Sequence, residues 1–409
     1  MNLLHVIASV NPVIGGTIET VQQLGGTLVS RGHRNEIASL DPPDVPYLEC
    51  SVPIYPLGPT TLKYAFSRRF VPWLRDNRRR YDVVIVHGLW QFHSFAAWRV
   101  LRNSDTPYVV YTHGMLDPWF KTHYPLKHLK KLVYWPWAEY RVLRDAKVVL
   151  FTCEQERILA RQSFWLYRCN EIVASCGTAR PEGNAELQLK EFLSRYPQLR
   201  GKKIVLFLGR IHPKKGCDLL IDAFAKVLGK HHEWSLVVAG PDQVGWQAAL
   251  NRRAEQLGIS SRITWTGMLS GTSKWGAFRS AEIFVLPSHQ ENFGLAVAEA
   301  LAVGLPTLIS NKVNIWREVE REKAGIVAAD TFAGSCALLQ KYLDMSEIDR
   351  STMRRRAYQC FERFEIGQAA ERLEMVLKSI LKGPDRTIEM RPLATDPRPA
   401  VRAVSGSRD

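Results

Sequence analysis

The sequence lacks any run of about 18 consecutive apolar residues, which is the length that a helix needs to cross a bilayer. It also lacks a basic cluster ahead of its first apolar stretch, Met1–Ile7, and a secretory signal would carry one. We therefore interpret Met1–Ile7 as the first strand of a folded domain, and we predict neither a membrane span nor a cleaved leader.

Cysteine is scarce. The seven cysteines are scattered over 409 residues, and no two of them have the Cys-x-x-Cys spacing that is typical of metal or redox sites. This distribution argues against a disulfide framework and against structural zinc. It favours a reducing compartment, so we expect a cytoplasmic protein.

Acidic residues are outnumbered, with 40 Asp and Glu against 55 Lys and Arg, and the net charge is +15. This excess indicates an anionic partner (nucleic acid, anionic lipid or nucleotide phosphate), and a merely solvated basic surface is the alternative. Because RNP-like, zinc-finger and basic-zipper signatures are missing, we do not expect nucleic acid. A basic cluster in the N-terminal half makes an anionic membrane surface a candidate partner; it comprises Arg68-Arg69, Arg75, Arg78–Arg80, Lys121, Lys127 and Lys130-Lys131.

The sequence does contain a series of short apolar runs, each closed by Gly, Pro or polar residues. Several are apolar at every position, as strands covered on both faces are, and helical patterns lie between them. This alternation predicts parallel sheets built from right-handed crossover units. The predicted strands are Leu3–Ser9, Val83–His87, Tyr108–Thr112, Lys147–Thr152, Ile172–Ala174, Ile204–Leu208, Ser235–Ala239, Ile263–Thr266, Ile283–Pro287 and Thr307–Ser310, and the predicted helices include Thr20–Arg31, Asp218–Leu228, Trp246–Leu257 and Ala296–Val303.

The series of strands stops after residue 174 and resumes at Ile204, which predicts two α/β domains at 1–177 and 185–365. A last helix over 366–382 is predicted to follow, and the tail, 383–409, is poor in apolar residues and is predicted to be disordered. Ligands of open parallel sheets bind beyond the carboxyl ends of the strands, so two such domains facing one another would share a cleft.

Residues 285–306 form the most informative segment. A buried strand is followed there by a polar loop, and a helix starts near Gly294. The free backbone amides at such a helix start are a ready site for phosphate oxygens.

Two acidic residues lie in this segment. Glu299 is the only charged residue between Leu295 and Val303, and so apolar a helix requires hydrogen-bond donors for it, such as ribose hydroxyls. An exposed position on an amphipathic helix is the alternative for Glu299. Glu291, on the preceding loop, is placed to meet the other end of the same ligand.

A second strand-to-helix turn, at residues 207–218, carries Arg210 and Lys215. Two cations on one turn can clamp a diphosphate, and the alternative is that they are surface charges on a loop. Asp218 is predicted to cap the following helix.

Weaker candidates follow strands of the N-terminal half. Gly15 and Gly16 would let the backbone approach a ligand closely, although such a pair also marks an ordinary tight turn. His113 could bind a sugar hydroxyl, and the alternative is a structural histidine. His87 is a further candidate on the acceptor side.

On two of these motifs the chain resembles a known family. Glu291 and Glu299 enclose seven residues, the E-x7-E pattern, and residues 209–216 are similar to the family's G-R-x-x-x-x-K-G signature. Both are typical of retaining glycosyltransferases of the GT-B architecture, and the chain is most similar to family 4 (glycosyltransferase group 1). The resemblance spans about residues 1–381 and implies an α/β fold with two Rossmann-like parallel-sheet domains facing a cleft and a C-terminal helix that crosses back to the N-domain. It also implies that the first domain, 1–177, is the acceptor side and that the second, 185–365, binds the nucleotide-sugar.

The resemblance also implies residue roles. Arg210 and Lys215 would neutralise the leaving diphosphate, and His113 and Glu291 would touch the donor sugar, while Glu299 would hold the ribose. The other donor-binding positions that it implies are Gly15, Gly16, Gly240, Met268, Leu269, Asn292, Phe293, Gly294 and Leu295.

The expected activity is transfer of a hexose-type sugar from a UDP- or GDP-linked donor to a hydroxyl of a glycan or lipid-linked glycan, with retained configuration. The chain contains no Asp-x-Asp motif, so we expect no metal ion and no cofactor. The run His113–Leu116, with Trp135, Trp137 and Glu139, is similar to bacterial enzymes that assemble surface polysaccharide, which would act at the inner face of the plasma membrane. The alternatives are a nucleotide-sugar epimerase or phosphorylase, and a nucleotide-sugar-binding protein without transfer.

Overall fold

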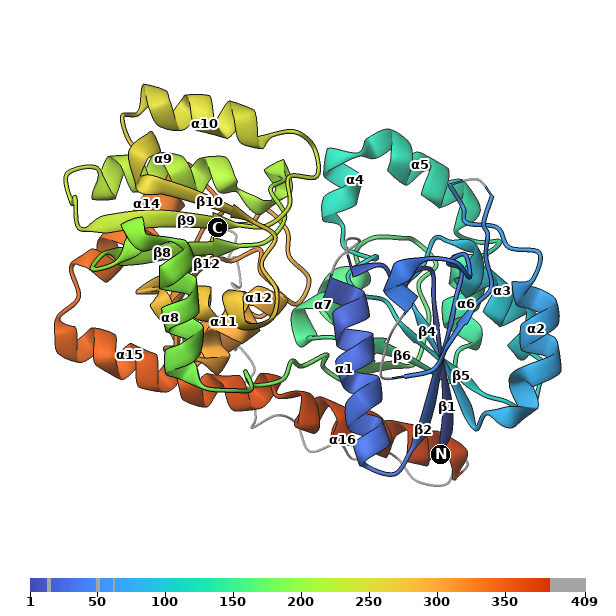
Figure 1. Ribbon diagram of the computed structural model, residues 1–409. Helices are drawn as coiled ribbons and strands as arrows, with labels where there is room; N and C mark the ends of the chain where they lie inside the picture. The colour runs from blue at the N-terminus through green and yellow to red at the C-terminus, as the bar shows by residue number, and fades with distance from the viewer. Residues whose placement is uncertain (13–15, 49–51, 62, 383–409) are drawn as a thin grey trace, which may run out of the picture.

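The computed structural model describes residues 1–12, 16–48, 52–61 and 63–382. It contains two parallel sheets, each covered by helices, which lie side by side with the candidate site between them (Figure 1). Gly15 and the tail at 383–409, which was predicted to be disordered, lie outside the described residues.

The N-terminal sheet consists of β1 (Asn2–Ile7), β2 (Arg34–Ser39), β3 (Ile54–Pro56), β4 (Val83–His87), β5 (Tyr108–Tyr111), β6 (Val148–Phe151) and β7 (Glu171–Val173). The seven strands are parallel, in the order β3-β2-β1-β4-β5-β6-β7. In β4, Val84 and Val86 pack into the core on one face of the sheet and Val83 and Ile85 into the core on the other. Burial on both faces explains the unbroken apolar runs.

The helices of this half are α1 (Gly16–Ser30), α2 (Phe70–Asn77), α3 (Phe92–Leu101), α4 (Trp119–His123), α5 (Pro125–Tyr134), α6 (Glu139–Asp145) and α7 (Glu154–Ala160). On one face of the sheet, α1 packs with the last helix of the chain, α16 (Ile366–Leu381), through Leu24, Leu28, Leu373 and Leu377. The opposite face is covered by α2, α3 and α6.

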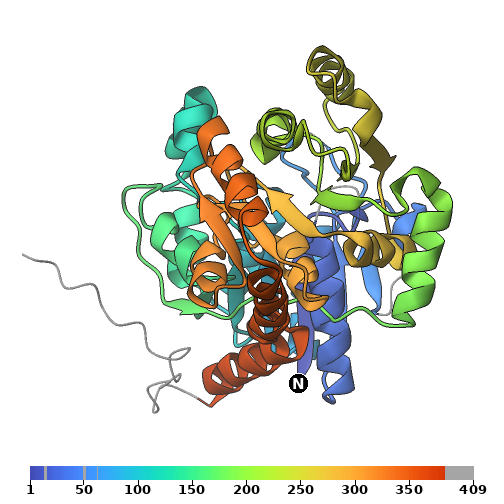
Figure 2. The same ribbon diagram turned by 90° about the vertical axis from the view of Figure 1, so that its left-hand side faces the viewer.

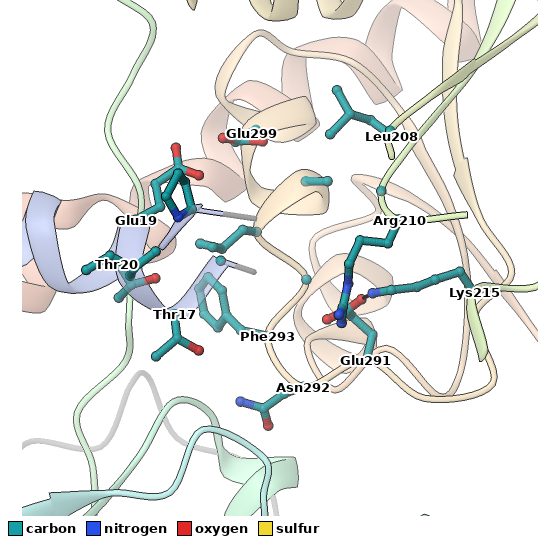
Figure 3. A pocket seen from close by; sticks show the side chains of 18 of the residues that line it. Thr17, Glu19, Thr20, Leu208, Arg210, Lys215, Glu291, Asn292, Phe293 and Glu299 are labelled. Atoms are coloured by element: carbon teal, nitrogen blue, oxygen red, sulfur yellow. Dashed lines mark hydrogen bonds and ion pairs between the residues drawn. The ribbon is translucent and has the colours of Figure 1, made fainter. Parts of the chain in front are cut away.

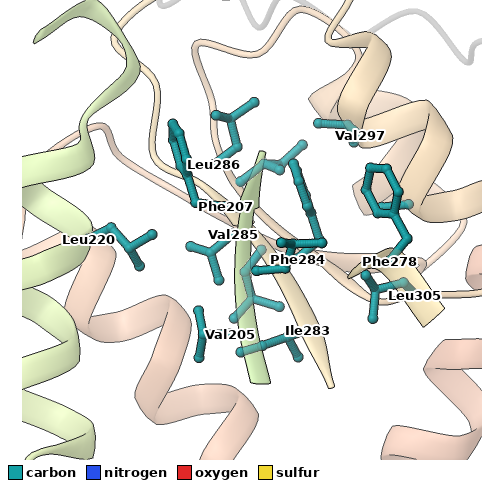
Figure 4. Packing of buried hydrophobic residues seen from close by; sticks show 14 of the residues in the cluster. Val205, Phe207, Leu220, Phe278, Ile283, Phe284, Val285, Leu286, Val297 and Leu305 are labelled. Atoms are coloured by element: carbon teal, nitrogen blue, oxygen red, sulfur yellow. The ribbon is translucent and has the colours of Figure 1, made fainter. Parts of the chain in front are cut away.

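The C-terminal sheet consists of β8 (Lys203–Leu208), β9 (Trp234–Ala239), β10 (Ile263–Gly267), β11 (Ile283–Leu286), β12 (Thr307–Ser310) and β13 (Gly325–Ala328), which are parallel in the order β10-β9-β8-β11-β12-β13. Its helices are α8 (Ala185–Arg195), α9 (Cys217–Leu228), α10 (Gln247–Gln256), α11 (Gly271–Ser280), α12 (Leu295–Ala302), α13 (Trp316–Arg321), α14 (Phe332–Leu343) and α15 (Glu347–Cys360). Figure 4 shows the core of this half, in which Phe207 and Phe284 from adjacent strands pack with Leu220 and Val297 from the covering helices. This core holds the ends of β8 and β11, which carry the two motifs.

The strand prediction missed β2, β3 and β13. β3 and β13 are edge strands of their sheets and are only partly buried. β2 starts with the polar residues Arg34, Asn35 and Glu36, and the last two are buried because they have partners: Glu36 accepts hydrogen bonds from Arg34 and from the hydroxyl of Tyr81.

The prediction that Asp218 caps α9 is wrong. The helix begins at Cys217, and its N-cap is Gly216, whose φ of 69° is left-handed; Asp218 lies in the first turn. An acidic residue there still interacts favourably with the positive end of the helix dipole.

The last helix, α16, crosses back to the N-terminal half (Figures 1 and 2). Glu374 on α16 accepts a hydrogen bond from Arg31 Nε at 2.8 Å, and its other oxygen lies 3.3 Å from His33 Nε2. The backbone amide of Thr178 donates to the carbonyl of Phe364 at 2.8 Å, so the linker and the start of this helix are joined. No described helix is long and apolar enough to span a membrane.

Candidate functional site

A cavity of about 660 Å³ lies between the two halves, lined by α1 and by the loops that follow β5, β8, β9, β10 and β11. Figure 3 shows Arg210, Lys215 and Glu291 close together on one side of the cavity, with Glu299 on α12 and Glu19 on α1 at its other end. The described residues that the sequence predicted for the site all line this cavity: Gly16, His113, Arg210, Lys215, Gly240, Met268, Leu269, Glu291, Asn292, Phe293, Gly294, Leu295 and Glu299.

The start of α12 forms one wall of the cavity. Gly294 has φ = 77°, a left-handed conformation that strains other residues, and a Cβ there would lie 3.1 Å from Val313 Cγ1. The helix begins at the next residue, Leu295, and its first amides have no acceptor within the helix. Leu295 also touches α1 of the other half, since a Cβ on Gly16 would lie 2.5 Å from Leu295 Cδ1. The arrangement presents backbone donors to any anion in the cavity.

Gly240 lies at the end of β9, where two loops pass very close together. A Cβ on Gly240 would lie 1.9 Å from the carbonyl oxygen of Gly209, so only glycine fits there. Met268 and Leu269 line the cavity beside it. This wall is made largely of backbone and apolar side chains.

Arg210, Lys214 and Lys215 gather on the loop after β8. Lys215 forms an ion pair with Glu291 (Figure 3), and Arg210 Nη1 donates to Gln243 Oε1 at 3.0 Å. Burial first, and then repulsion by the neighbouring cations, lowers the pKa of Lys214 to about 8 and that of Lys215 to about 7. Three crowded cations make this loop a strong binder of a polyvalent anion.

Glu299 is only 3% exposed, so the alternative of an exposed position is wrong. Lys274 Nζ donates to Glu299 Oε1 at 2.7 Å and to Glu19 Oε1, on α1 of the other half, at 3.2 Å. Burial raises the pKa of Glu299 to about 7, and the charge of Lys274 opposes that rise. The sequence analysis missed Lys274 and Glu19, because neither belongs to a motif and helical periodicity does not show which residues face a cavity.

His113 is the end of a hydrogen-bonded chain that runs through the N-terminal sheet. Its Nε2 lies 3.0 Å from His87 Nδ1, and His87 Nε2 lies 2.9 Å from His5 Nδ1. The chain ends at Asn35, whose Oδ1 lies 3.1 Å from His5 Nε2. We call these four residues the histidine chain. Three of its members sit on adjacent parallel strands, and His113 follows β5 with φ = 48°, which is unusual for a residue other than glycine.

The histidine chain determines which nitrogen of His113 carries a proton. Desolvation lowers the pKa of His5 and of His113 to about 4 and that of His87 further, so all three rings are neutral near pH 7. Asn35 Oδ1 can only accept, so His5 Nε2 donates to it and His5 Nδ1 accepts in turn. His87 Nε2 therefore donates to His5 Nδ1, and His87 Nδ1 accepts from His113 Nε2. Nδ1 of His113 is left with a lone pair.

Glu156 fixes the loops around His113 and was also missed. It is buried, and its two oxygens accept from Thr112 Oγ1, from the amide of Gly114 and from the amide of Thr152, at 2.6 to 2.7 Å. Asn292, from the other half, donates to Thr152 Oγ1 at 3.0 Å. Glu156 lies in the first turn of the helix that follows β6, and this position after a strand was the available signal for it.

A second cavity, of about 310 Å³, lies within the N-terminal half beside the first. His87 lines it together with polar side chains from the ends of other strands, Ser9, Asp41 and Gln91. The two cavities share lining residues on α1 and at Met115, so a ligand of one can reach a ligand of the other.

Family models match most of the chain. Residues 190–359 match a model described as glycosyl transferases group 1, and residues 15–169 match one described as a glycosyl transferase 4-like domain. The chain belongs to the group 1 glycosyltransferases. The first of these segments contains the cationic loop, Glu291 and Glu299.

Curated relatives match this glycosyltransferase over part of their length. An uncharacterized glycosyltransferase of Methanocaldococcus jannaschii is 32% identical over 125 residues, which are 31% of this chain and 31% of that protein. The lipopolysaccharide core biosynthesis mannosyltransferase LpsB of Rhizobium meliloti is 26% identical over 188 residues, 44% of this chain and 53% of that protein. The matched segments thus span about a third to a half of these relatives.

Solved structures resemble the glycosyltransferase over nearly its whole length. Sucrose-phosphate synthase of Thermosynechococcus elongatus superposes with a TM-score of 0.76 at 18% identity, covering 93% of this chain and 99% of that one. HepE of Anabaena in complex with UDP-glucose superposes with a TM-score of 0.73 at 15% identity, covering 93% and 100%. At these identities the likeness concerns the fold, and it confirms the predicted GT-B architecture.

Proposed function

We propose that this glycosyltransferase moves a hexose-type sugar from a UDP- or GDP-linked donor to a hydroxyl of a glycan or lipid-linked glycan. The transfer retains the anomeric configuration and serves polysaccharide assembly at the cytoplasmic side of a membrane. The names of the related proteins support this direction, since HepE was solved with UDP-glucose and LpsB is a mannosyltransferase of lipopolysaccharide core biosynthesis.

The observation that carries the proposal is the convergence of four cations (Arg210, Lys214, Lys215 and Lys274) and a helix start on one cavity that also holds Glu291 and Glu299. These charges pair across the cavity, Lys215 with Glu291 and Lys274 with Glu299. Donor binding exchanges these partners. Lys215 turns to the diphosphate and Glu291 to the sugar hydroxyls, while Glu299 accepts from the ribose.

The reaction breaks the bond between the anomeric carbon and the phosphate oxygen and forms a bond from that carbon to the acceptor oxygen. Negative charge grows on the departing diphosphate, and Arg210, Lys215 and the amides after Gly294 stabilise it without a metal ion. The acceptor arrives on the same face of the sugar, and the departing phosphate oxygen takes its proton. His113 Nδ1 accepts a hydrogen bond from a sugar hydroxyl.

The acceptor binds in the second cavity, which adjoins the donor site. Asp41 and Gln91 offer hydrogen-bonding groups for sugar hydroxyls there, and the apolar Ile7 and Ile18 complete the wall. Sugar rings bind to surfaces of this mixed kind.

A thermal-shift panel of UDP- and GDP-sugars tests the donor site. We expect one donor to raise the melting temperature of the wild type and to have no effect on Glu299→Ala, because that variant loses the ribose partner. Glu320→Ala, which removes an exposed carboxylate of the same half, is the control and should respond like the wild type.

Donor consumption, measured with and without glycan acceptors, separates transfer from the alternatives. A stabilised protein that consumes no donor would be a binding protein, and one that releases an epimer or free sugar without an acceptor would not be a transferase. Either result would contradict the proposed function.

A further inference from the structure

Helix α5 carries an apolar stripe on its outer side. Leu126, Leu129 and Val133, at spacings of three and four residues, lie on one side of the helix and are 78%, 58% and 69% exposed. The opposite side is the one that packs, with His128 buried and Leu132 against the core of the N-terminal half. The helix is therefore held on one side by the fold and presents a second apolar side to solvent.

The stripe continues beyond the helix. Trp137 follows α5 and is exposed, as are Trp165 and Leu166 on the loop after α7. This loop is fixed next to the end of α5, because Trp135 Nε1 donates to the carbonyl of Trp165 at 2.9 Å. Large aromatic and aliphatic side chains are thus gathered at one end of the N-terminal half, and such patches mark interaction sites.

The surroundings of the stripe are purely basic. No acidic residue occurs between Asp117 and Glu139, whereas Lys121, Lys127 and Lys130 are exposed there. On the helix, Lys130 lies next to Leu126 and Val133 around the axis. Apolar side chains flanked by lysines, with tryptophan at the margin, match the boundary between headgroups and acyl chains of an anionic bilayer.

The other basic segment, Arg68–Arg80, lacks this combination. Its aromatic neighbours are used in packing: Tyr64 makes edge contacts with Phe92 and Tyr134, and Trp73 lies against Tyr55. Arg80 donates to Asn77 and to Glu36. This segment offers charge but little free apolar surface.

The segment that leads into α5 touches the donor site. Asp117 accepts from Gln290 Nε2, of the other half, at 2.9 Å, and Lys214 Nζ lies over the rings of Trp119 and Phe120 at 5.5 and 5.2 Å. Figure 1 shows α4 and α5 together at the end of the N-terminal half that is opposite the N-terminus. The basic apolar surface and the mouth of the cleft are therefore parts of one continuous region.

We propose that Leu126, Leu129, Val133 and Trp137, with Lys127 and Lys130, dock the protein on the surface of an anionic phospholipid bilayer. The apolar stripe enters the headgroup region and the lysines contact lipid phosphates. The enzyme lies on the membrane with its cleft mouth beside the lipid surface. This docking does not depend on which sugar is transferred.

Co-sedimentation of the full chain with vesicles tests the docking. We expect the wild type to bind vesicles of phosphatidylglycerol and phosphatidylcholine and to bind pure phosphatidylcholine weakly. The triple variant Leu126→Gln, Leu129→Gln, Val133→Gln should bind the anionic vesicles more than about tenfold more weakly. Its matched control replaces three exposed aliphatic residues of the other half, Val244→Gln, Leu257→Gln and Ile348→Gln, and should bind like the wild type.

A charge-reversal pair distinguishes the two basic segments. Lys127→Glu with Lys130→Glu should abolish vesicle binding, whereas Arg75→Glu with Arg79→Glu should leave most of it. Equal loss in both pairs, or full binding by the triple glutamine variant, would overturn the proposal.

Sedimentation velocity without vesicles tests the alternative that a second copy of the protein binds to the apolar stripe. If the wild type is a dimer that the triple variant dissociates, the stripe is an interface between copies and the membrane proposal is wrong. The thermal shift by a nucleotide-sugar reports the donor site in every variant, so a failure of the proposed function appears there and leaves vesicle binding unchanged.

Discussion

At the scale of single residues, the site is built from charged groups that pair with one another. Glu299 is held by Lys274, and Glu291 by Lys215. Burial of such groups without partners would cost several kcal/mol, so each buried charge of the site lies beside a partner of opposite charge. In the histidine chain, the single acceptor Asn35 Oδ1 likewise sets the orientation of the hydrogen bonds of all three rings.

The histidine chain yields a test at Asn35. In Asn35→Leu the acceptor for His5 is lost, so the rings can reverse their tautomers and His113 no longer keeps a lone pair on Nδ1. We expect kcat/KM for the donor to fall by about tenfold, the equivalent of one hydrogen bond of about 1.4 kcal/mol. Long-range proton–nitrogen NMR spectra of the histidines should show a bare Nδ1 at His113 in the wild type and mixed protonation in the variant.

Asn35→Asp is the matched control, because it keeps an acceptor oxygen at the same place. It should preserve the His113 tautomer. A protonated Nδ1 on His113 in the wild-type spectrum would refute the assigned direction of the chain.

At the scale of elements, the chemistry lies where strands end and helices begin. The ends of β8 and β11 are neighbours in the sheet, and their loops deliver Arg210, Lys215, Glu291 and the start of α12 to the same place. Parallel strands make this possible because all their carboxyl ends lie at one edge.

The left-handed backbone of Gly294 at the start of α12 can be tested by substitution. Gly294→Ala places a side chain at φ = 77°, and we expect a loss of about 1 kcal/mol of unfolding free energy. Gly258→Ala is the control, because its φ is 68° and a Cβ there meets nothing within 4 Å. Both variants should lose similar stability in urea, whereas only Gly294→Ala should also lose the thermal shift by donor.

At the scale of the whole molecule, two sheets form the cleft and α16 ties them together. Glu374 is the polar centre of that tie. Hydrogen bonds from Lys378 and then from Arg31 and His33 lower its pKa to about 2. A carboxylate whose pKa is depressed in the folded state stabilises the fold above its unfolded pKa, and this stabilisation is lost as the pH falls toward the folded value.

Glu374→Gln should therefore lower the unfolding free energy by on the order of 1 kcal/mol at pH 7. The difference from the wild type should stay constant down to about pH 5 and shrink as the pH falls from 4.5 toward 2, because the wild-type carboxylate loses its advantage there. Urea titrations across this range measure it. Glu371→Gln, at an exposed position of the same helix, should show no such trend.

Local sequence determined the donor half of the site. Glu291, Gly294 and Glu299 lie on one strand–loop–helix segment. Because only a few residues separate them, the sequence predicted that they lie close together in the fold. The apolar runs determined most strands for a similar reason, since burial on both faces excludes polar residues. β2 escaped notice because its Asn35 and Glu36 are polar yet buried, Asn35 beside His5 of β1 and Glu36 bonded to Arg34 and Tyr81.

Only the tertiary structure decided which distant residues meet. Lys274, Glu19 and Glu299 lie on three different helices and meet only in the folded protein. The histidine chain depends on the order in which β2, β1, β4 and β5 lie side by side. In α5, Leu126, Leu129 and Val133 share one side of the helix, yet the fold buries the side with His128 and leaves these three exposed. Sequence periodicity shows that a helix has two different faces, but the packing of the whole chain decides which face is buried and which is exposed.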